Sequence, residues 1–443
     1  MNAVSSLKHW IGKYRNNLLL SRLLSVLSID ILVKLSGVIL LPIYLRLMTQ
    51  DEYGLYGYLL SIILTFSVVL NFGLYIPLSK FYHDYEDKND RGELLFTIIS
   101  LLAGILILVI VPVYYFGLDY DLVKILFKNQ INYPNYRGSV LLALIATIFN
   151  FMLTNFFFTS EKIKHLKQYN IFRIIFINLI TLAFLFILSD KDKVRTRLES
   201  SYLVELILFF FFFYIYAKEI NPKFNRKMAG PALKLALPVM LSAVFGIVIN
   251  FSDKFFLEKY GSFKDMSYYY LAVSCASVIP MIFASFQNAW LPLFLKEKDL
   301  QKNIAKTNKL MIRLFFIFLA LSVFILLFVK SLLLLNIIQS KYYETMFILP
   351  ILLIAQIISA LVPLYTNYLV YFEKTHIVSI TGLTVCCISL GLSVLIIPRY
   401  GVYGAATVSL LGNLSYFIIY YFIVKIYKEK KIAGISPIAE KIS

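Results

Sequence analysis

The sequence has few charged residues for its length. Asp, Glu, Lys and Arg make up 15% of the 443 residues, whereas about 25% is usual in soluble globular proteins. Hydrophobic residues reach 60%, and the mean hydropathy is +0.77. A soluble protein of this composition could not cover its surface with polar groups. The composition therefore predicts an integral membrane protein.

Cysteine and histidine are also scarce. The three cysteines, Cys275, Cys386 and Cys387, fall in apolar segments and form no Cys-x-x-Cys pair or Cys/His cluster. A disulfide framework or a zinc site is therefore not expected. The four histidines fall in tails or loops, which leaves none for chemistry at membrane depth. The sequence predicts no catalytic residue, metal site or cofactor.

Twelve apolar runs are long enough to cross a bilayer, which needs about 20 residues. No cleavable signal peptide is expected, because the polar and basic N-terminal segment, residues 1–23, leads into a first run that is too long. The run Phe209–Phe213 is predicted to face lipid. The spans are predicted at 24–46, 55–77, 93–116, 139–158, 170–189, 201–217, 233–252, 267–290, 310–329, 346–371, 377–397 and 402–424.

The distribution of basic residues predicts the orientation. The formal net charge is +18, and in a soluble protein such an excess would suggest nucleic acid as a partner. Here the basic residues lie in short loops, so topology explains them and no nucleic acid is expected. With the N-terminus inside, the inner segments carry about twice as many Lys and Arg as the outer loops, which indicates cytoplasmic termini.

Two short motifs recur at similar spacing in the two halves of the chain. Asn155…Glu161-Lys162 matches Asn367…Glu373-Lys374 at an offset of 212, and the residues Glu52, Tyr56 and Ser61 match Asp265, Tyr269 and Ser274 at an offset of 213. These offsets predict two six-helix halves of the same orientation, a transporter plan with a site between the halves. The predicted organisation is an N-lobe (24–217), a cytoplasmic linker (218–232), a C-lobe (233–424) and a cytoplasmic tail (425–443).

A cation lies midway along the first span. Asp30, Lys34 and Gly37 share one helical face. A charge at this depth costs roughly 2.5–3.5 kcal/mol on insertion scales, so Lys34 is expected to face protein or water. Two interpretations stay open at this point. Lys34 lines a cavity and attracts an anionic substrate, or it forms a self-neutralising pair with Asp30.

Several other spans carry polar stripes, which should face inward because lipid-facing surfaces are apolar. Interhelical hydrogen bonding, worth about 0.6 kcal/mol per contact, is the alternative explanation for any single residue. Taken together, the stripes favour a hydrated cavity. The candidate substrate-binding residues are Asp30, Lys34, Asn250, Asp253, Asn288, Gln356 and Asn367.

Four further ionisable residues have open roles. Glu205 and Asp30 are candidates for binding a coupling proton or cation, although Glu205 would equally suit a basic partner. Arg173 and Arg313 are placed near the cytoplasmic ends of spans five and nine. They are candidates for receiving phosphate at the inner mouth, and snorkelling to anionic headgroups is the alternative explanation.

Two stretches of the sequence resemble a known family. Residues 41–57, Leu-Pro-Ile-Tyr-Leu-Arg-Leu-Met-Thr-Gln-Asp-Glu-Tyr-Gly-Leu-Tyr-Gly, look like the first-helix signature of Wzx-type polysaccharide flippases. Residues 253–261, with the core Asp253-Lys254-Phe255-Phe256-Leu257, are similar to the seventh-helix signature of that family. These flippases belong to the multidrug/oligosaccharidyl-lipid/polysaccharide (MOP) exporter superfamily.

The resemblance implies an all-α membrane protein with twelve transmembrane helices in two six-helix lobes, working by alternating access. It implies transport of an oligosaccharide on undecaprenyl diphosphate, for O-antigen or another surface polysaccharide, to the outer leaflet of the bacterial inner membrane. The bilayer is an expected partner, and other polysaccharide-assembly proteins are a further candidate. Family members often carry Arg on cavity helices. The mid-membrane cation here is Lys34, which cannot grip phosphate in a bidentate manner.

Two other function classes fit parts of the sequence. A drug/cation antiporter of the MATE type would share the fold, but it would favour acidic residues over a buried lysine. A polysaccharide polymerase or ligase would also have many spans, but it usually needs a substantial outer domain, and the loops here are short. The sequence therefore predicts a transporter that is not an enzyme.

Overall fold

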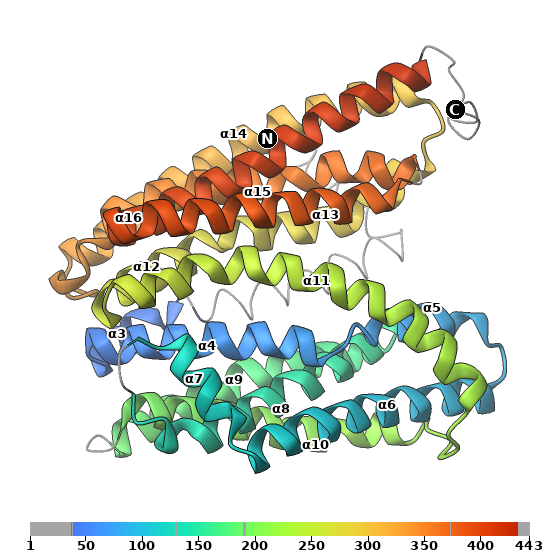
Figure 1. Cartoon of the computed structure of the whole chain (residues 1–443), viewed down its shortest axis with the longest axis horizontal. Coiled ribbons are helices and arrows are strands. Elements are labelled where there is room, and N and C mark those ends of the chain that lie inside the picture. The colour runs from blue at the N-terminus through green and yellow to red at the C-terminus, as the bar shows by residue number, and fades with distance from the viewer. Residues whose placement is uncertain (1–36, 38, 129–130, 189–191, 373, 433–443) are drawn as a thin grey trace, which may run out of the picture. The chain divides into compact units, whose positions relative to one another are not determined.

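The computed structural model describes residue 37 and residues 39–128, 131–188, 192–372 and 374–432 (Figure 1). Every regular element within these ranges is helical. The elements are α3 (Leu41–Leu47), α4 (Gln50–Leu70), α5 (Tyr75–Asp84), α6 (Lys88–Tyr115), α7 (Leu118–Leu126), α8 (Tyr133–Thr159), α9 (Ile163–Ile187), α10 (Lys193–Ala217), α11 (Arg226–Tyr260), α12 (Phe263–Ala276), α13 (Val278–Lys296), α14 (Leu300–Leu334), the 3-10 turn η1 (Ser340–Tyr342), α15 (Thr345–Tyr371) and α16 (Thr375–Ile432).

Ten helical segments of the described chain are long and apolar enough to cross a membrane. The segment within α16 contains two predicted spans, 377–397 and 402–424. They are separated at Gly401, whose φ of 52° and ψ of −125° break the helical path just after Pro398. Glycine tolerates this positive φ because it has no Cβ. The first predicted span, 24–46, lies outside the described residues except for its end at α3.

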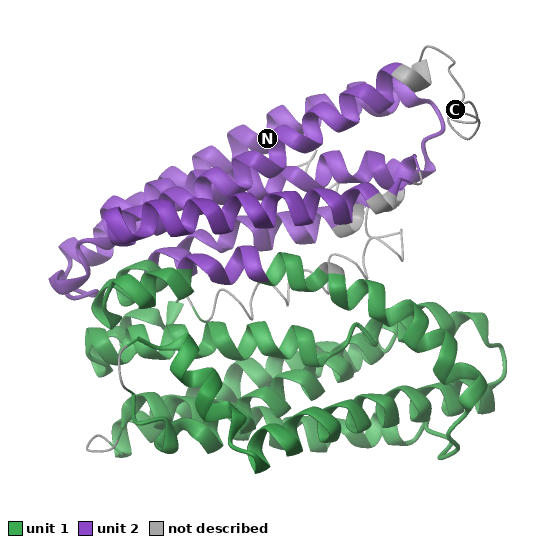
Figure 2. Ribbon diagram, in the orientation of Figure 1, with its two compact units in different colours: residues 1–247, 254–270 green, residues 248–253, 271–443 purple. Residues whose placement is uncertain are grey.

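The chain divides into two compact units (Figure 2). One unit runs up to residue 247 and includes 254–270, and the other contains 248–253 and 271–443. Helices α11 and α12 each contribute to both units. The lobe limits drawn from the sequence, with a linker at 218–232, stay a prediction.

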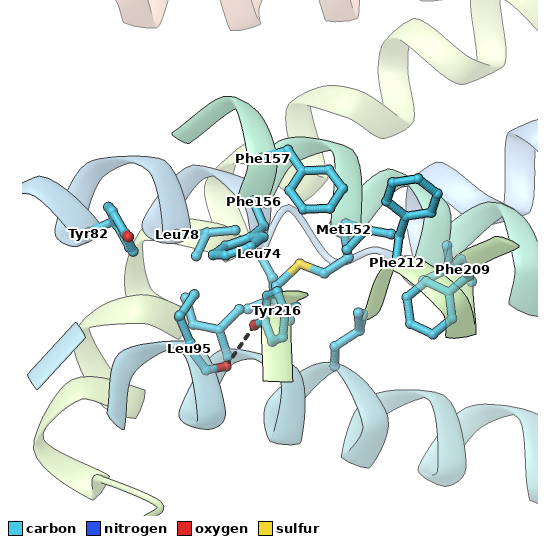
Figure 3. Packing of buried hydrophobic residues seen from close by; sticks show 14 of the residues in the cluster. Leu74, Leu78, Tyr82, Leu95, Met152, Phe156, Phe157, Phe209, Phe212 and Tyr216 are labelled. Atoms are coloured by element: carbon cyan, nitrogen blue, oxygen red, sulfur yellow. Dashed lines mark hydrogen bonds between the residues drawn. The ribbon is translucent and has the colours of Figure 1, made fainter. Parts of the chain in front are cut away.

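The first unit has an aromatic core. Phe156 and Phe157 of α8 pack with Phe212 and Tyr216 of α10, and the Tyr216 hydroxyl donates to the Leu95 carbonyl of α6 at 3.0 Å (Figure 3). The prediction that Phe209–Phe213 faces lipid is wrong for part of this run. Phe209 and Phe212 are buried whereas Phe210 and Phe211 are exposed, because the helical period turns part of any such run inward.

The second unit has its own core of aromatic and aliphatic side chains from α13, α15 and α16. Phe294 and Tyr368 meet edge to face with ring centroids 4.9 Å apart, next to Tyr420 and Val424. Edge-to-face contacts place a positive ring edge on a negative ring face, so they contribute beyond the area that they bury. Each unit therefore has an independent hydrophobic core.

The matching residues Glu52 and Asp265 take part in the same type of helix cap. Thr49 and Glu52 form a capping box at the start of α4, in which each side chain accepts from the backbone amide of the other. Ser262 and Asp265 exchange the same pair of hydrogen bonds at the start of α12, 3.2 and 3.0 Å long. The recurring sequence spacing is thus accompanied by a recurring helix start.

Candidate functional site

A buried polar network joins three helices of the first unit. The guanidinium Nη2 of Arg173 on α9 lies 2.5 Å from Oε1 of Glu205 on α10. Nδ2 of Asn150, on α8, donates to the same oxygen at 2.6 Å. Glu205 is only 2% exposed, so its charge depends on these two partners for compensation. One turn from Glu205, the hydroxyls of Thr181 and Ser201 lie 3.1 Å apart and continue the polar contacts between α9 and α10.

The network has hydrogen-bonding capacity to spare. Nε of Arg173, Oδ1 of Asn150 and the Tyr169 hydroxyl are buried, and none has a hydrogen-bond partner among the described residues. Buried polar atoms are normally satisfied, often by ordered water. The cluster therefore offers donors and acceptors to water, to a proton or to a polar ligand group inside an apolar bundle.

The second unit holds a reciprocal amide pair. Gln287 on α13 donates from Nε2 to Oδ1 of Asn367 on α15 at 2.7 Å, and Nδ2 of Asn367 lies 3.4 Å from Oε1 of Gln287. Asn367 is 3% exposed. The sequence pointed to Asn288 on α13, whose side chain lies outside the described residues. The partner that the structure shows is its neighbour, Gln287.

The other predicted site residues take no part in the hydrogen bonds and the ion pair that define these two clusters. Asp30 and Lys34 lie outside the described residues. On α11, Asp253 is buried and Asn250 is exposed. Gln356 is half-buried about three turns before Asn367 on α15, and Arg313 is exposed on α14. Of the predicted residues, the structure brings Arg173 and Glu205 together.

The sequence missed Gln287 and Arg197 as site residues, and it placed Asn150 on an inward polar stripe of the fourth span without naming it as a candidate. Arg197 lies before the predicted sixth span, because the apolar run of that span begins only at residue 201. The structure starts α10 at Lys193, where the Asp192 carboxylate accepts from the amides of Val194 and Arg195. The spacing of Arg197 and Glu205, eight residues, would have placed both on one face of a longer helix.

The described residues contain no group of three or more His, Cys, Asp or Glu side chains that could hold a metal ion. The two clusters are built from one ion pair, amides and hydroxyls. Such groups bind and orient charged or hydroxylated ligands and can pass a proton. The helices that carry them expose large apolar side chains such as Phe211, Leu293 and Ile354.

These features define a multi-pass helical membrane protein with buried polar clusters, and its fold is that of MOP-superfamily transporters. A structure described as "Lipid II flippase MurJ, inward closed conformation" superposes with a TM-score of 0.71 at 16% identity, covering 90% of this chain and 87% of that one. An inward-facing multidrug resistance MATE transporter of the MOP superfamily gives 0.68 at 13% identity, with coverages of 93% and 96%. The outward-facing form gives 0.57 at 14%, with coverages of 92% and 94%.

The family model described as "Polysaccharide biosynthesis protein" matches residues 19–298. The chain belongs to this family. No curated protein matches the chain significantly. The resemblance seen in the sequence is confirmed at the level of family and superfamily fold, and so is the all-helical class with two lobes of transmembrane helices.

Proposed function

We propose that the protein is a flippase that moves an undecaprenyl-diphosphate-linked oligosaccharide from the cytoplasmic to the outer leaflet of the bacterial inner membrane. The family match carries this proposal, because residues 19–298 include both signature stretches, 41–57 and 253–261. The fold also supports the proposal, since a solved structure named as a lipid II flippase shares this fold over most of both chains. Both termini are proposed to be cytoplasmic.

The substrate has three parts that need different environments. The diphosphate needs cations, for which Lys34 in the first span and Arg173 are the candidates, with Arg313 at the inner mouth. The glycan needs hydrogen-bonding groups, which the polar residues of the second unit offer: Asn250, Asp253, Asn288, Gln356 and Asn367. The polyprenyl tail needs neither and stays in the bilayer. Alternating access then moves only the polar head through the protein.

The ion pair between Arg173 and Glu205 suggests how substrate and coupling ion are linked. Glu205 supplies the negative charge that compensates the half-buried Arg173 guanidinium. If Glu205 takes up a proton, that compensation is lost and Arg173 becomes free to bind a phosphate oxygen. Proton binding at Glu205 and anion binding at Arg173 would therefore favour each other. Asp30 is the other candidate for such coupling.

The proposal is tested by deleting the gene and assaying lipid-linked intermediates in each leaflet. Surface polysaccharide should vanish, and complete undecaprenyl-diphosphate repeat units should accumulate on the cytoplasmic side. The wild-type gene should restore their transfer, whereas Lys34→Ala should not. Repeat units that accumulate on the outer face would show that flipping still occurs, and the protein would then be a polymerase or ligase.

The antiporter of the MATE type is the second candidate, favoured by one observation. Glu205 is a buried carboxylate in the first unit, and MATE transporters share the fold. Purified protein in liposomes separates the two functions. Proton-driven uptake of a lipophilic cation, without transfer of the lipid-linked glycan, would overturn the flippase and support the antiporter.

A further inference from the structure

Arg197 is held in a clamp of tyrosine rings in the first unit. Its guanidinium carbon lies 3.8 Å from the ring centroid of Tyr44 and 3.9 Å from that of Tyr56. Tyr53 contributes a third ring at 5.9 Å. We call Tyr44 and Tyr56 the tyrosine clamp. Tyr44 lies on α3 and Tyr56 on α4, and both residues belong to the signature stretch 41–57. Arg197 lies on α10.

The tyrosine clamp is itself fixed in place. The Tyr44 hydroxyl donates to Oδ1 of Asn178 on α9 at 3.3 Å. The Tyr56 ring meets the edge of Tyr270, with centroids 6.4 Å apart. Both rings are more than nine-tenths buried. The position of the Arg197 guanidinium between these rings is therefore set by the protein rather than by a ligand.

No carboxylate compensates Arg197 within the described part of the chain. Arg197 is 9% exposed, and within the described residues its Nη1 donates to Sδ of Met48 at 3.5 Å. Sulfur is a weak acceptor, and stacking on tyrosine satisfies the faces of the guanidinium but not its N–H edge. No N–H nitrogen of Arg197 is among the fully buried atoms that lack a partner in the described residues, so its unfilled donors stay within reach of an anion.

Three acidic residues near Arg197 and its clamp along the chain, Glu52, Asp192 and Glu199, have other partners, and Asp51 is exposed. Glu52 closes the capping box with Thr49. Asp192 caps α10 and accepts from the Tyr136 hydroxyl at 2.5 Å. Glu199 accepts from Arg195 at 2.7 Å and from Ser139 at 2.9 Å. None of these carboxylates pairs with Arg197, so its positive charge stays available.

We propose that Arg197, positioned by Tyr44 and Tyr56, binds a phosphate group at the end of the first unit where α10 begins. A planar guanidinium held at its two faces presents its N–H edge, and this edge matches two phosphate oxygens. The phosphate is that of the lipid-linked diphosphate or of a phospholipid headgroup. The first source rests on the proposed function, and on the topology predicted from loop charges the site lies in the outer half of the membrane.

The site would complement the pair formed by Arg173 and Glu205. Arg197 and Glu205 are separated by eight residues of α10, which corresponds to about 12 Å along the helix. The two arginines differ in one respect, since Arg173 has a carboxylate partner and Arg197 has none within the described residues. A diphosphate moving outward would thus meet a compensated cation first and an uncompensated one later.

The experiment measures phosphate binding by purified protein, as a shift of the thermal unfolding midpoint and as a titration. The probes are inorganic diphosphate in detergent, and undecaprenyl diphosphate or phosphatidylglycerol in nanodiscs. A ligand that binds only the folded state raises the midpoint with its concentration. Wild type should be stabilised, and Arg197→Met should bind inorganic diphosphate at least about tenfold more weakly, a loss of about 1.4 kcal/mol.

Three further variants separate binding from a structural role. Arg195→Met removes a half-exposed arginine of the same helix and should bind like wild type. Arg197→Lys keeps the charge but loses the planar edge, so it should bind weakly even where Arg197→Met fails to fold. Tyr56→Leu keeps the cation but opens the clamp, and it should weaken binding without abolishing it.

The outcomes are distinct. Equal diphosphate affinity in wild type, Arg197→Met and Arg197→Lys would overturn the site, as would no binding by wild type. Binding of phosphatidylglycerol but not of undecaprenyl diphosphate, if it depends on Arg197, supports the site and assigns its ligand to bilayer lipid. Arg197-dependent diphosphate binding by a wild-type protein that fails to flip the lipid-linked glycan supports the site while overturning the proposed function.

Discussion

The Arg173 guanidinium and the Glu205 carboxylate lie 2.5 Å apart on consecutive helices of the first unit. The predicted spans, 170–189 and 201–217, put Arg173 and Glu205 each about one turn from the start of its span. Both helices extend further than their apolar runs, so that each residue lies about three turns inside its helix. The residue predicted to bind phosphate and the residue predicted to bind the coupling ion are therefore partners.

Replacing one partner of this ion pair should destabilise the protein more than replacing both partners together. Glu205→Gln leaves the Arg173 charge uncompensated, and Arg173→Met leaves a carboxylate that is 3% exposed. Each single change should cost on the order of 3 kcal/mol, whereas Arg173→Met combined with Glu205→Gln should cost clearly less than the sum. Thermal unfolding of the four proteins in detergent measures the coupling. Additive single effects would contradict a coupled pair.

Gly54 should not tolerate a side chain. A Cβ at Gly54 of α4 would collide with the carbonyl oxygen of Phe263 at the start of α12, which is backbone and cannot move aside. Gly54→Ala should therefore destabilise the protein by about 1–3 kcal/mol, in spite of the better helix propensity of alanine. The matched control is Gly104→Ala on α6. A Cβ there has nothing within 4 Å, so this variant should be unchanged or more stable by up to about 1 kcal/mol. Equal midpoints for both variants would contradict the close approach.

The amide pair of the second unit should matter more for transport than for stability. Interhelical hydrogen bonds in membranes contribute about 0.6 kcal/mol on average, so Asn367→Leu should shift the unfolding midpoint only slightly. If Asn367 and Gln287 also bind the glycan, Asn367→Leu should lower the flipping rate several-fold. Asn413→Leu on α16 is the control, because within the described part of the chain Asn413 donates to the carbonyl of Ser409 on its own helix and to no other helix. Equal loss of transport in both variants would argue against a specific role for the pair.

The cap of α10 should control the early start of this helix. Asp192 accepts from two backbone amides of the first turn and from Tyr136. Asp192→Ala should cost about 1–2 kcal/mol, and Asp192→Asn should cost less because it can still cap. Hydrogen exchange of the amides of Val194 and Arg195 measures this effect locally. Unchanged protection in Asp192→Ala would show that tertiary packing alone fixes the first turn.

The membrane class, the helical fold and the recurring motif were all predictable from the sequence, because each depends on local pattern. A helix is the simplest way for one segment to satisfy its backbone in lipid, so a run of about 20 apolar residues largely decides the structure of that segment. The helix start at Thr49 and its counterpart at Ser262 follow from residues three positions apart. Span limits were less predictable, as α10 shows, because a cap can extend a helix into charged sequence.

The site was only partly predictable for a physical reason. The sequence identified Arg173, Glu205 and Asn367 as polar residues that lipid would not tolerate, and this follows from each residue alone. Which residues meet depends on the rotation and register of packed helices, which many side-chain contacts fix together. The pairing of Glu205 with Arg173 and Asn150, the choice of Gln287 for Asn367, and the stacking of Arg197 between Tyr44 and Tyr56 were therefore decided by the tertiary structure. The sequence by itself determined that the protein spans a membrane as helices with polar groups inside. Only packing determined which buried charge is compensated by a neighbour and which is left for a ligand.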